Sequence, residues 1–317
     1  MPESKDFTSI RVCTLRGDIK TPFNVYIQAG NKHILYCRSG DSFAGDRLKR
    51  LAAKKLKHLY IRPDDLKRYE EYVARSIEQA YDPSSGRSLE VRAEVIQGFQ
   101  QAKAQDLMTE PQSQSTYNFV RASVHRFVDF LAKEAMSVNA LLRQENMDAS
   151  ISHHSVNVAT LSTALALKSY GPDSPLLQSL SLGCLIHDID HFHSKFNVER
   201  SPKQMESDGD FAVYKAHPLN GAQRFQGAMF LDPLVLKIIS QHEEHMDGSG
   251  FPQGLKGSEM DPLIMIAATA NAYDRLVSFD RMEPKAALKH LLIDKMGAFP
   301  LENLQALQAI LKEQGVV

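Results

Sequence analysis

The sequence predicts an α+β protein, in which a small α/β domain precedes an all-α helical bundle. Two observations lead to this prediction. Residues 7–62 contain short β-branched and aromatic segments separated by glycines, whereas most of the later chain has apolar residues at helical spacing. A polar break at residues 110–115 separates the two patterns. We therefore expect one domain over residues 1–112, which includes a linker helix, and a second over residues 113–317.

The N-terminal domain should contain four short strands and two helices. Strand-like composition occurs at residues 11–15, 24–28, 33–37 and 57–62, and helical patterns occur at residues 46–56 and 64–81. This region contains no catalytic constellation of side chains. We therefore expect a regulatory or interaction domain, with a signalling protein as a candidate partner.

The C-terminal domain should be helical throughout. From Phe119 to Leu142, apolar residues recur at a spacing that suits one buried helix face. Three later helices have clear starts, because a capping side chain precedes a proline at Ser174-Pro175, Asp232-Pro233 and Asp261-Pro262. These otherwise apolar helices carry ionisable residues, and buried ionisable groups need a partner that a metal ion can supply.

Composition excludes several classes of function. The 317-residue chain has a net charge of −1, whereas a general DNA-binding protein needs a basic surface. Its three cysteines are far apart and form no CxxC motif, which favours a reducing compartment. The N-terminus lacks the apolar core of a signal peptide, and no apolar run approaches the roughly 20 residues of a membrane helix. We expect a cytoplasmic protein that binds neither DNA nor membranes.

Histidines are concentrated in one part of the chain. Eight of the twelve lie between His153 and His245. They include a His187-Asp188 pair and a His242-Glu243 pair before a glycine-rich segment. Imidazole and carboxylate ligands without thiolates suit iron, manganese or zinc in a hydrolytic site.

Four motifs in order resemble the HD-GYP family, the branch of HD-domain phosphohydrolases that hydrolyses cyclic di-GMP. They are the helix that starts near His154, the HDIG-like segment His187-Asp-Ile-Asp190, the pair His217-Pro218, and the HHExxDGxGYP-like segment from His242 to Pro252. The resemblance covers about residues 150–278 and implies that the bundle is an all-α HD domain. It also implies these metal ligands: His154, His187, Asp188, His217, His242, Glu243 and Asn271. Asp188 would bridge two ions and so act in catalysis, and Asp274 would orient a ligand or contact the substrate.

The chain also departs from the family pattern near the metal ligands. Glu243 replaces a histidine, Asn271 replaces an aspartate, and Phe251 replaces the GYP tyrosine and lacks its hydroxyl group. This makes the chain an unconventional member. Ser150 replaces a glutamate that supports a third metal in some members. We therefore expect two ions per chain, with iron as the first choice and manganese as the second.

Two further departures concern substrate binding. His191 replaces a family lysine and is a candidate catalytic residue that contacts phosphate when it is protonated. The basic segment after the late aspartates is shortened, which leaves Arg281 as a candidate substrate contact together with Phe251.

Two functions fit these patterns. The first is a metal-dependent phosphodiesterase that hydrolyses cyclic di-GMP, using a hydroxide activated by two ions about 3.5–4 Å apart. The alternative is a catalytically weak or inactive relative that serves as a nucleotide sensor or protein-interaction module. The metal positions favour the enzyme, whereas His191, Phe251 and the shortened segment favour the alternative. Hydrolysis of another phosphoester is a third, weaker possibility.

Overall fold

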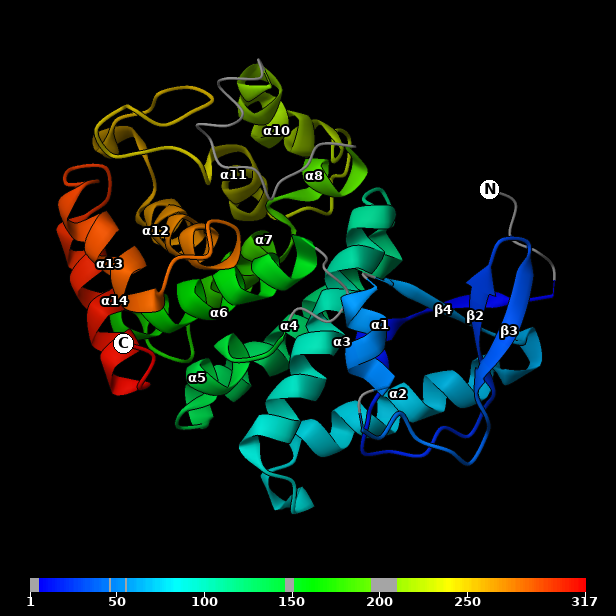
Figure 1. The fold of residues 1–317 in the computed structure, drawn as a ribbon. Helices are drawn as coiled ribbons and strands as arrows, with labels where there is room; N and C mark the ends of the chain where they lie inside the picture. Colours follow the sequence, from blue (N-terminus) through cyan, green and yellow to red (C-terminus); the bar gives the residue numbers. More distant parts are fainter. Residues whose placement is uncertain (1–5, 46, 55, 146–150, 195–209) are drawn as a thin grey trace. The chain divides into compact units, whose positions relative to one another are not determined.

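The computed structural model describes residues 6–45, 47–54, 56–145, 151–194 and 210–317 (Figure 1). Its internal contacts divide the chain into two compact units. The first comprises Met1–Ala102 and Gln144–His153, and the second comprises Lys103–Arg143 and His154–Val317. The boundary predicted between residues 112 and 113 lies just after the end of helix α3 (Leu89–Thr109). The internal contacts instead place the boundary inside this helix, between Ala102 and Lys103.

The first unit contains an antiparallel four-stranded sheet with strand order β1-β4-β2-β3. The strands are β1 (Thr8–Arg11), β2 (Val25–Ala29), β3 (Lys32–Cys37) and β4 (His58–Ile61). The helices α1 (Arg47–Ala53) and α2 (Leu66–Tyr81) complete the α/β arrangement with the first part of α3. Strands β2 and β3 form a hairpin whose turn contains Gly30 at a φ of +59°, a conformation that favours glycine.

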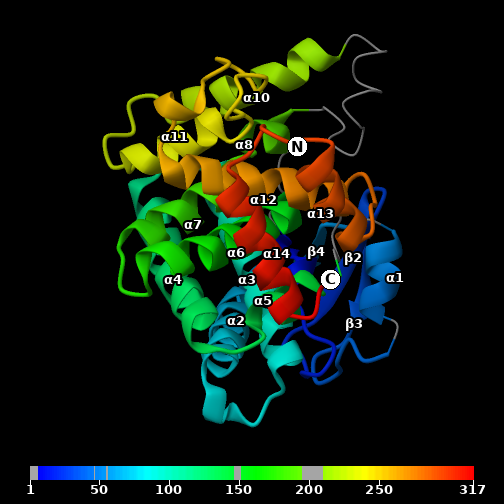
Figure 2. The same ribbon diagram turned by 90° about the vertical axis from the view of Figure 1, so that its left-hand side faces the viewer.

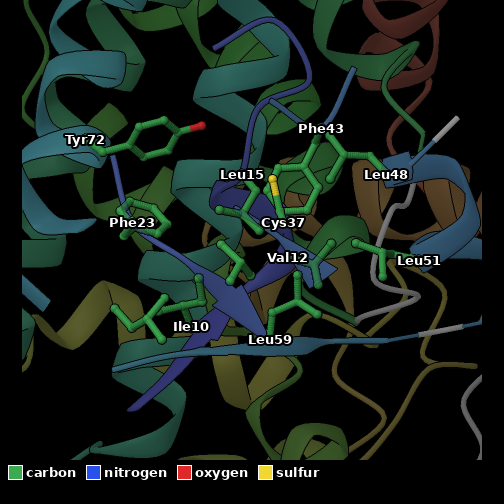
Figure 3. Close-up of a cluster of buried hydrophobic side chains, with 12 residues drawn as sticks. Ile10, Val12, Leu15, Phe23, Cys37, Phe43, Leu48, Leu51, Leu59 and Tyr72 are labelled. Carbon is green, nitrogen blue, oxygen red and sulfur yellow. The ribbon is translucent and has the colours of Figure 1, made fainter. Parts of the chain in front are cut away.

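The core of this unit lies around the sheet (Figure 3). Its buried side chains include Ile10, Val12, Leu15, Phe23, Cys37, Phe43, Leu48, Leu51, Leu59 and Tyr72. The predicted strand at residues 11–15 is largely wrong, because β1 ends at Arg11 and Val12–Thr14 forms a 3-10 turn. Local bonds explain this difference. The Leu15 N–H donates to the Val12 carbonyl at 3.0 Å, and the Thr14 hydroxyl donates to the Arg11 carbonyl at 2.8 Å.

The second unit is helical, as the sequence predicts (Figures 1 and 2). In addition to the end of α3, its helices are α4 (Gln114–Lys133), α5 (Ser137–Leu142), α6 (Ile151–Tyr170, from His154 onward), α7 (Leu176–Ile186), α8 (Ile189–His193), α10 (Phe211–Gln223), α11 (Pro233–Gln241), α12 (Pro262–Ser278), α13 (Pro284–Ile293) and α14 (Leu301–Glu313). Helix α11 packs against α7, α10 and α12, and α12 also packs against α7, α13 and α14. None of the helices in the described ranges is long and apolar enough to cross a membrane.

Two of the three predicted helix caps are present. The Asp232 and Asp261 side chains each accept a backbone N–H two residues later, at 2.8 and 2.9 Å. The prediction for Ser174 is wrong, because α7 begins at Leu176 without a side-chain cap. There, the Ser174 backbone carbonyl accepts the N–H of Leu177 at 3.2 Å.

The predicted buried face of α4 is correct in most of its length but not at its start. Phe119 is 59% exposed, whereas Val120, Val124 and Phe127 are buried. Adjacent residues on a helix point in different directions, so the buried face that contains Val120 leaves Phe119 outside it.

Candidate metal centre

Five helices bring most of the predicted metal ligands into one buried cluster. His154 lies on α6, His217 lies on α10 and Asn271 lies on α12. His187-Asp188 follows α7, and His242 follows α11. The cluster comprises His154, His187, Asp188, His217, His242 and Asn271, and each of these residues is at most 4% exposed.

Asp188 lies at the centre of five imidazole rings. The distances from its carboxylate oxygens to the Nε2 atoms are 3.3 Å for His187, 3.3 Å for His217, 3.5 Å for His242, 3.7 Å for His154 and 3.9 Å for His191. Burial raises the pKa of Asp188, but the neighbouring histidine rings, His187 first among them, outweigh burial and hold the pKa well below its ordinary value. The carboxylate is therefore ionised at the centre of the cluster.

The other nitrogen of these rings is held by the surrounding chain. In three histidines, Nδ1 bonds a backbone carbonyl: His187 bonds Cys184 at 2.6 Å, His217 bonds Tyr214 at 2.7 Å, and His242 bonds Ile239 at 3.0 Å. In His154, Nδ1 bonds Oδ2 of Asp274 at 2.6 Å. A carbonyl can only accept, so Nδ1 carries the hydrogen in His187, His217 and His242. When these rings are neutral, their Nε2 atoms present lone pairs to the cluster, as metal-binding histidines do.

These lone pairs fit a bound cation. Nε2 of His217 lies 2.8 Å from Nε2 of His242, and two acceptor nitrogens at this distance repel unless a proton or metal ion lies between or beside them. Nε2 of His187 is buried and has no hydrogen-bond partner among the described residues. Potential ligand atoms lie within 4.8 Å of one another in three overlapping groups: His154-His187-Asp188, Asp188-His191-His217 and His217-His242-Glu243.

Glu243 and Asn271 extend the cluster with oxygen ligands. Glu243 accepts a hydrogen bond from the Tyr214 hydroxyl at 2.7 Å and one from the Asn271 amide at 3.3 Å. Burial raises the pKa of Glu243, but the neighbouring His242 and His217 lower it below its ordinary value. The Asn271 Oδ1 atom lies 3.0 Å from His154 Nε2, so these two atoms are close enough to bind the same ion.

Asp274 orients one of the histidines. Besides His154, its carboxylate accepts hydrogen bonds from Asn157 at 3.0 Å and Ser278 at 2.8 Å. These bonds fix both the carboxylate and the imidazole that it holds.

His191 is buried in the same cluster. Burial lowers its pKa well below the ordinary value, and His217 lowers it further. The neutral form therefore dominates near pH 7, whereas the phosphate contact expected from the sequence requires the protonated ring. A neutral ring instead suits the ligand group that His191 forms with Asp188 and His217.

The glycine-rich segment holds Phe251 at the edge of the cluster. The centre of its ring lies 5.5 Å from that of Tyr214 and 6.2 Å from that of His217. Gly250 must be a glycine, because a Cβ atom there would lie 2.2 Å from the backbone nitrogen of His245. Glu244, which is fully buried, accepts the N–H groups of Gln253 (2.6 Å) and Leu255 (2.9 Å) and so closes the loop.

The structure describes one of two further positions that the sequence singled out. Arg281 is exposed beyond the end of α12, with a backbone φ of +56°. Ser150, the basis for expecting two ions and not three, lies outside the described residues.

Tyr214 and Arg275 were not among the candidate residues predicted from the sequence. Tyr214 is buried, and the centre of its ring lies 5.6 Å from that of His191. The guanidinium carbon of Arg275 lies 4.8 Å from the centre of the Tyr214 ring. Helical spacing gave a weak signal for both, since Tyr214 precedes His217 by three residues on α10 and Arg275 follows Asn271 by four residues on α12.

Comparison with known proteins agrees with this arrangement. A family model described as an HD domain matches residues 137–296. A solved structure of an HDG"Y"P protein from Bdellovibrio bacteriovorus is 44% identical, covers 97% of this chain and 100% of that chain, and superposes with a TM-score of 0.91.

Two curated relatives are also similar to part of this chain. A cyclic di-GMP phosphodiesterase of Pseudomonas aeruginosa is 28% identical over 187 residues, which cover 59% of this chain and 43% of that protein. A 3'3'-cGAMP-specific phosphodiesterase of Vibrio cholerae is 29% identical over 147 residues, which cover 45% of this chain and 33% of that protein. The chain thus spans less than half the length of these relatives.

Proposed function

The chain belongs to the HD-domain family, and we propose that it is a metal-dependent phosphodiesterase that hydrolyses cyclic di-GMP. The main support is the convergence of imidazole Nε2 atoms on the ionised Asp188, while the surrounding chain holds the Nδ1 atoms. The names of the relatives support a cyclic dinucleotide as the substrate.

We propose two metal ions per chain. His154, His187 and Asn271 would hold one ion, and His217, His242 and Glu243 would hold the other. Asp188 would be shared by both ions, because its two oxygens face different histidines. Iron is the first choice and manganese the second, because sites of imidazole and carboxylate without sulfur accept both.

Bound ions would supply Lewis acidity and activate a water molecule for in-line attack on phosphorus. The side chains of the protein prepare the site for this reaction. Asp274 fixes the His154 ring, and backbone carbonyls fix the other rings so that they need no reorganisation. Tyr214 keeps its proton, because burial raises its pKa well above the ordinary value, and donates it in a hydrogen bond to Glu243.

The replacement Asp188→Ala tests this assignment. It should remove both ions and all hydrolysis of cyclic di-GMP while preserving the helical circular dichroism spectrum. Elemental analysis after anaerobic purification, with turnover assays on protein loaded with iron or manganese, measures both effects. Asp190→Asn is a matched control, because that carboxylate pairs with Arg224 at 2.7 Å and this replacement should leave the metal content unchanged. Two ions retained in Asp188→Ala would exclude a bridging role.

Glu243 provides an independent test of the second ion. The family has a histidine at this position, so Glu243→His should preserve metal content, whereas Glu243→Ala should reduce it. The alanine variant also leaves the Tyr214 hydroxyl without its acceptor at 2.7 Å. Equal metal content in the wild type and Glu243→Ala would mean that this carboxylate only accepts hydrogen bonds.

The alternative function is a sensor or interaction module that binds the nucleotide without significant turnover. Phe251 favours it, because the ring lies beside the cluster but has no hydroxyl group. Binding of cyclic di-GMP by metal-loaded protein without hydrolysis would support this alternative. The same assays with 3'3'-cGAMP would test substrate choice. An interaction of the N-terminal unit with a signalling protein also stays a prediction.

A further inference from the structure

Arg275 lies beside the metal cluster but is not one of its predicted ligands. It is half-buried on α12, and its guanidinium carbon lies 4.8 Å from the centre of the Tyr214 ring and 5.5 Å from that of Phe279. Both rings border the cluster. The Tyr214 hydroxyl donates to Glu243, and the centre of the Phe279 ring lies 5.0 Å from that of His154. These contacts hold the cation close to the ligands.

The chemistry of a guanidinium packed near two aromatic rings suits an anion. Cation–π packing stabilises the charge over the ring faces, while the N–H donors lie at the edges of the planar group. Two of these donors can bind two oxygens of one phosphate, which an ammonium group cannot do with the same geometry.

The charge of Arg275 acts on the cluster. Burial lowers the pKa of Arg275, but Tyr214, Glu243 and Asp188 outweigh burial and raise it, so the group stays protonated. With metal ions bound, this positive charge would face other positive charges. An anion that contacts both the ions and Arg275 would be stabilised by all of them.

We propose that Arg275 binds a non-bridging phosphate oxygen of the substrate next to the metal ions, with Tyr214 and Phe279 fixing the plane of its guanidinium group. This assignment rests on the proposed function, because it requires a phosphodiester substrate at the cluster. In this assignment, the arginine that contacts phosphate is Arg275, which packs against the site. Arg281, the candidate from the sequence, is exposed.

The test uses Arg275→Gln and Arg275→Lys in the metal-loaded full chain. Calorimetric titration with inorganic phosphate measures anion binding without depending on turnover, and elemental analysis measures metal content. Arg275→Gln should keep the wild-type metal content and weaken phosphate binding roughly ten- to hundredfold, the typical value of a charge-assisted hydrogen bond. Arg275→Lys should lose less phosphate affinity than Arg275→Gln, because lysine keeps the positive charge. It should still bind phosphate more weakly than the wild type, because it lacks the fork of donors. Lys285→Gln, which removes an exposed charge from α13, is the control and should bind phosphate as the wild type does.

Each outcome decides the assignment. Unchanged phosphate affinity in Arg275→Gln at full metal content would overturn it. Loss of metal from both Arg275 variants would also overturn it, because Arg275 would then support the cluster and not the anion. If Arg275→Gln does not fold, Arg275→Lys decides: weaker phosphate binding than in the wild type at full metal content would support the assignment, and unchanged binding would overturn it. A wild type that binds phosphate but does not hydrolyse cyclic di-GMP would refute the proposed function, and weaker phosphate binding in Arg275→Gln would then still support an anion contact at Arg275.

Discussion

Glu244 gives a stability prediction that does not depend on a bound metal ion. Its carboxylate is fully buried and accepts the N–H groups of Gln253 at 2.6 Å and Leu255 at 2.9 Å. These bonds tie the loop that contains Phe251 to the end of α11. In Glu244→Gln, the amide oxygen can keep one bond, but the NH₂ group cannot accept the other N–H.

The size of the effect follows from these two bonds. Losing one charge-assisted hydrogen bond costs about 1.5–3 kcal/mol, and leaving a buried N–H without an acceptor costs a similar amount. Because these two estimates partly describe the same loss, we expect Glu244→Gln to lower the free energy of unfolding by about 2–4 kcal/mol. Urea titration of metal-free wild type and variant, followed by circular dichroism, measures this difference.

Glu259→Gln is the matched control in the same loop. Its exposed carboxylate accepts a single N–H, from Lys256 at 2.9 Å, and its replacement should cost less than about 1 kcal/mol because water can replace the lost bond. If Glu244→Gln is no more destabilising than Glu259→Gln, the loop is not held by its buried carboxylate and the reasoning fails.

Three further predictions concern the same segment. Gly250→Ala places a Cβ atom 2.2 Å from the His245 nitrogen and 2.5 Å from the Glu244 Cα, so its melting temperature and metal content should both fall, and an unchanged melting curve would contradict the close approach. Phe251→Tyr should raise cyclic di-GMP turnover roughly ten- to hundredfold if the new hydroxyl bonds the transition state, and steady-state kinetics showing no gain would place the deficit elsewhere. The pKa of Glu243 is below its ordinary value of 4.5, so its contribution to metal-free stability should be complete above that pH and decline as pH falls through the lowered pKa. Between about pH 6 and about pH 3, the free energy of unfolding measured with urea should therefore fall less in Glu243→Gln than in the wild type. Equal decreases in the two proteins would contradict this role of Glu243.

Tertiary contacts decided the features of the site that local sequence could not predict. The bonds of Asp274 to His154 and of Tyr214 to Glu243 join residues 120 and 29 positions apart, so no local pattern shows them. The protonation state of His191 likewise depends on its burial, which its sequence neighbours do not reveal.

The sequence by itself determined the α+β class, the helical second half, and the order of histidine and carboxylate motifs. It also predicted the caps at Asp232 and Asp261, because a capping side chain bonds a backbone N–H only two residues away. The same local rule failed at Ser174, where the backbone carbonyl accepts the bond instead. Only the fold could place five imidazole rings around Asp188, because that arrangement depends on how the helices pack.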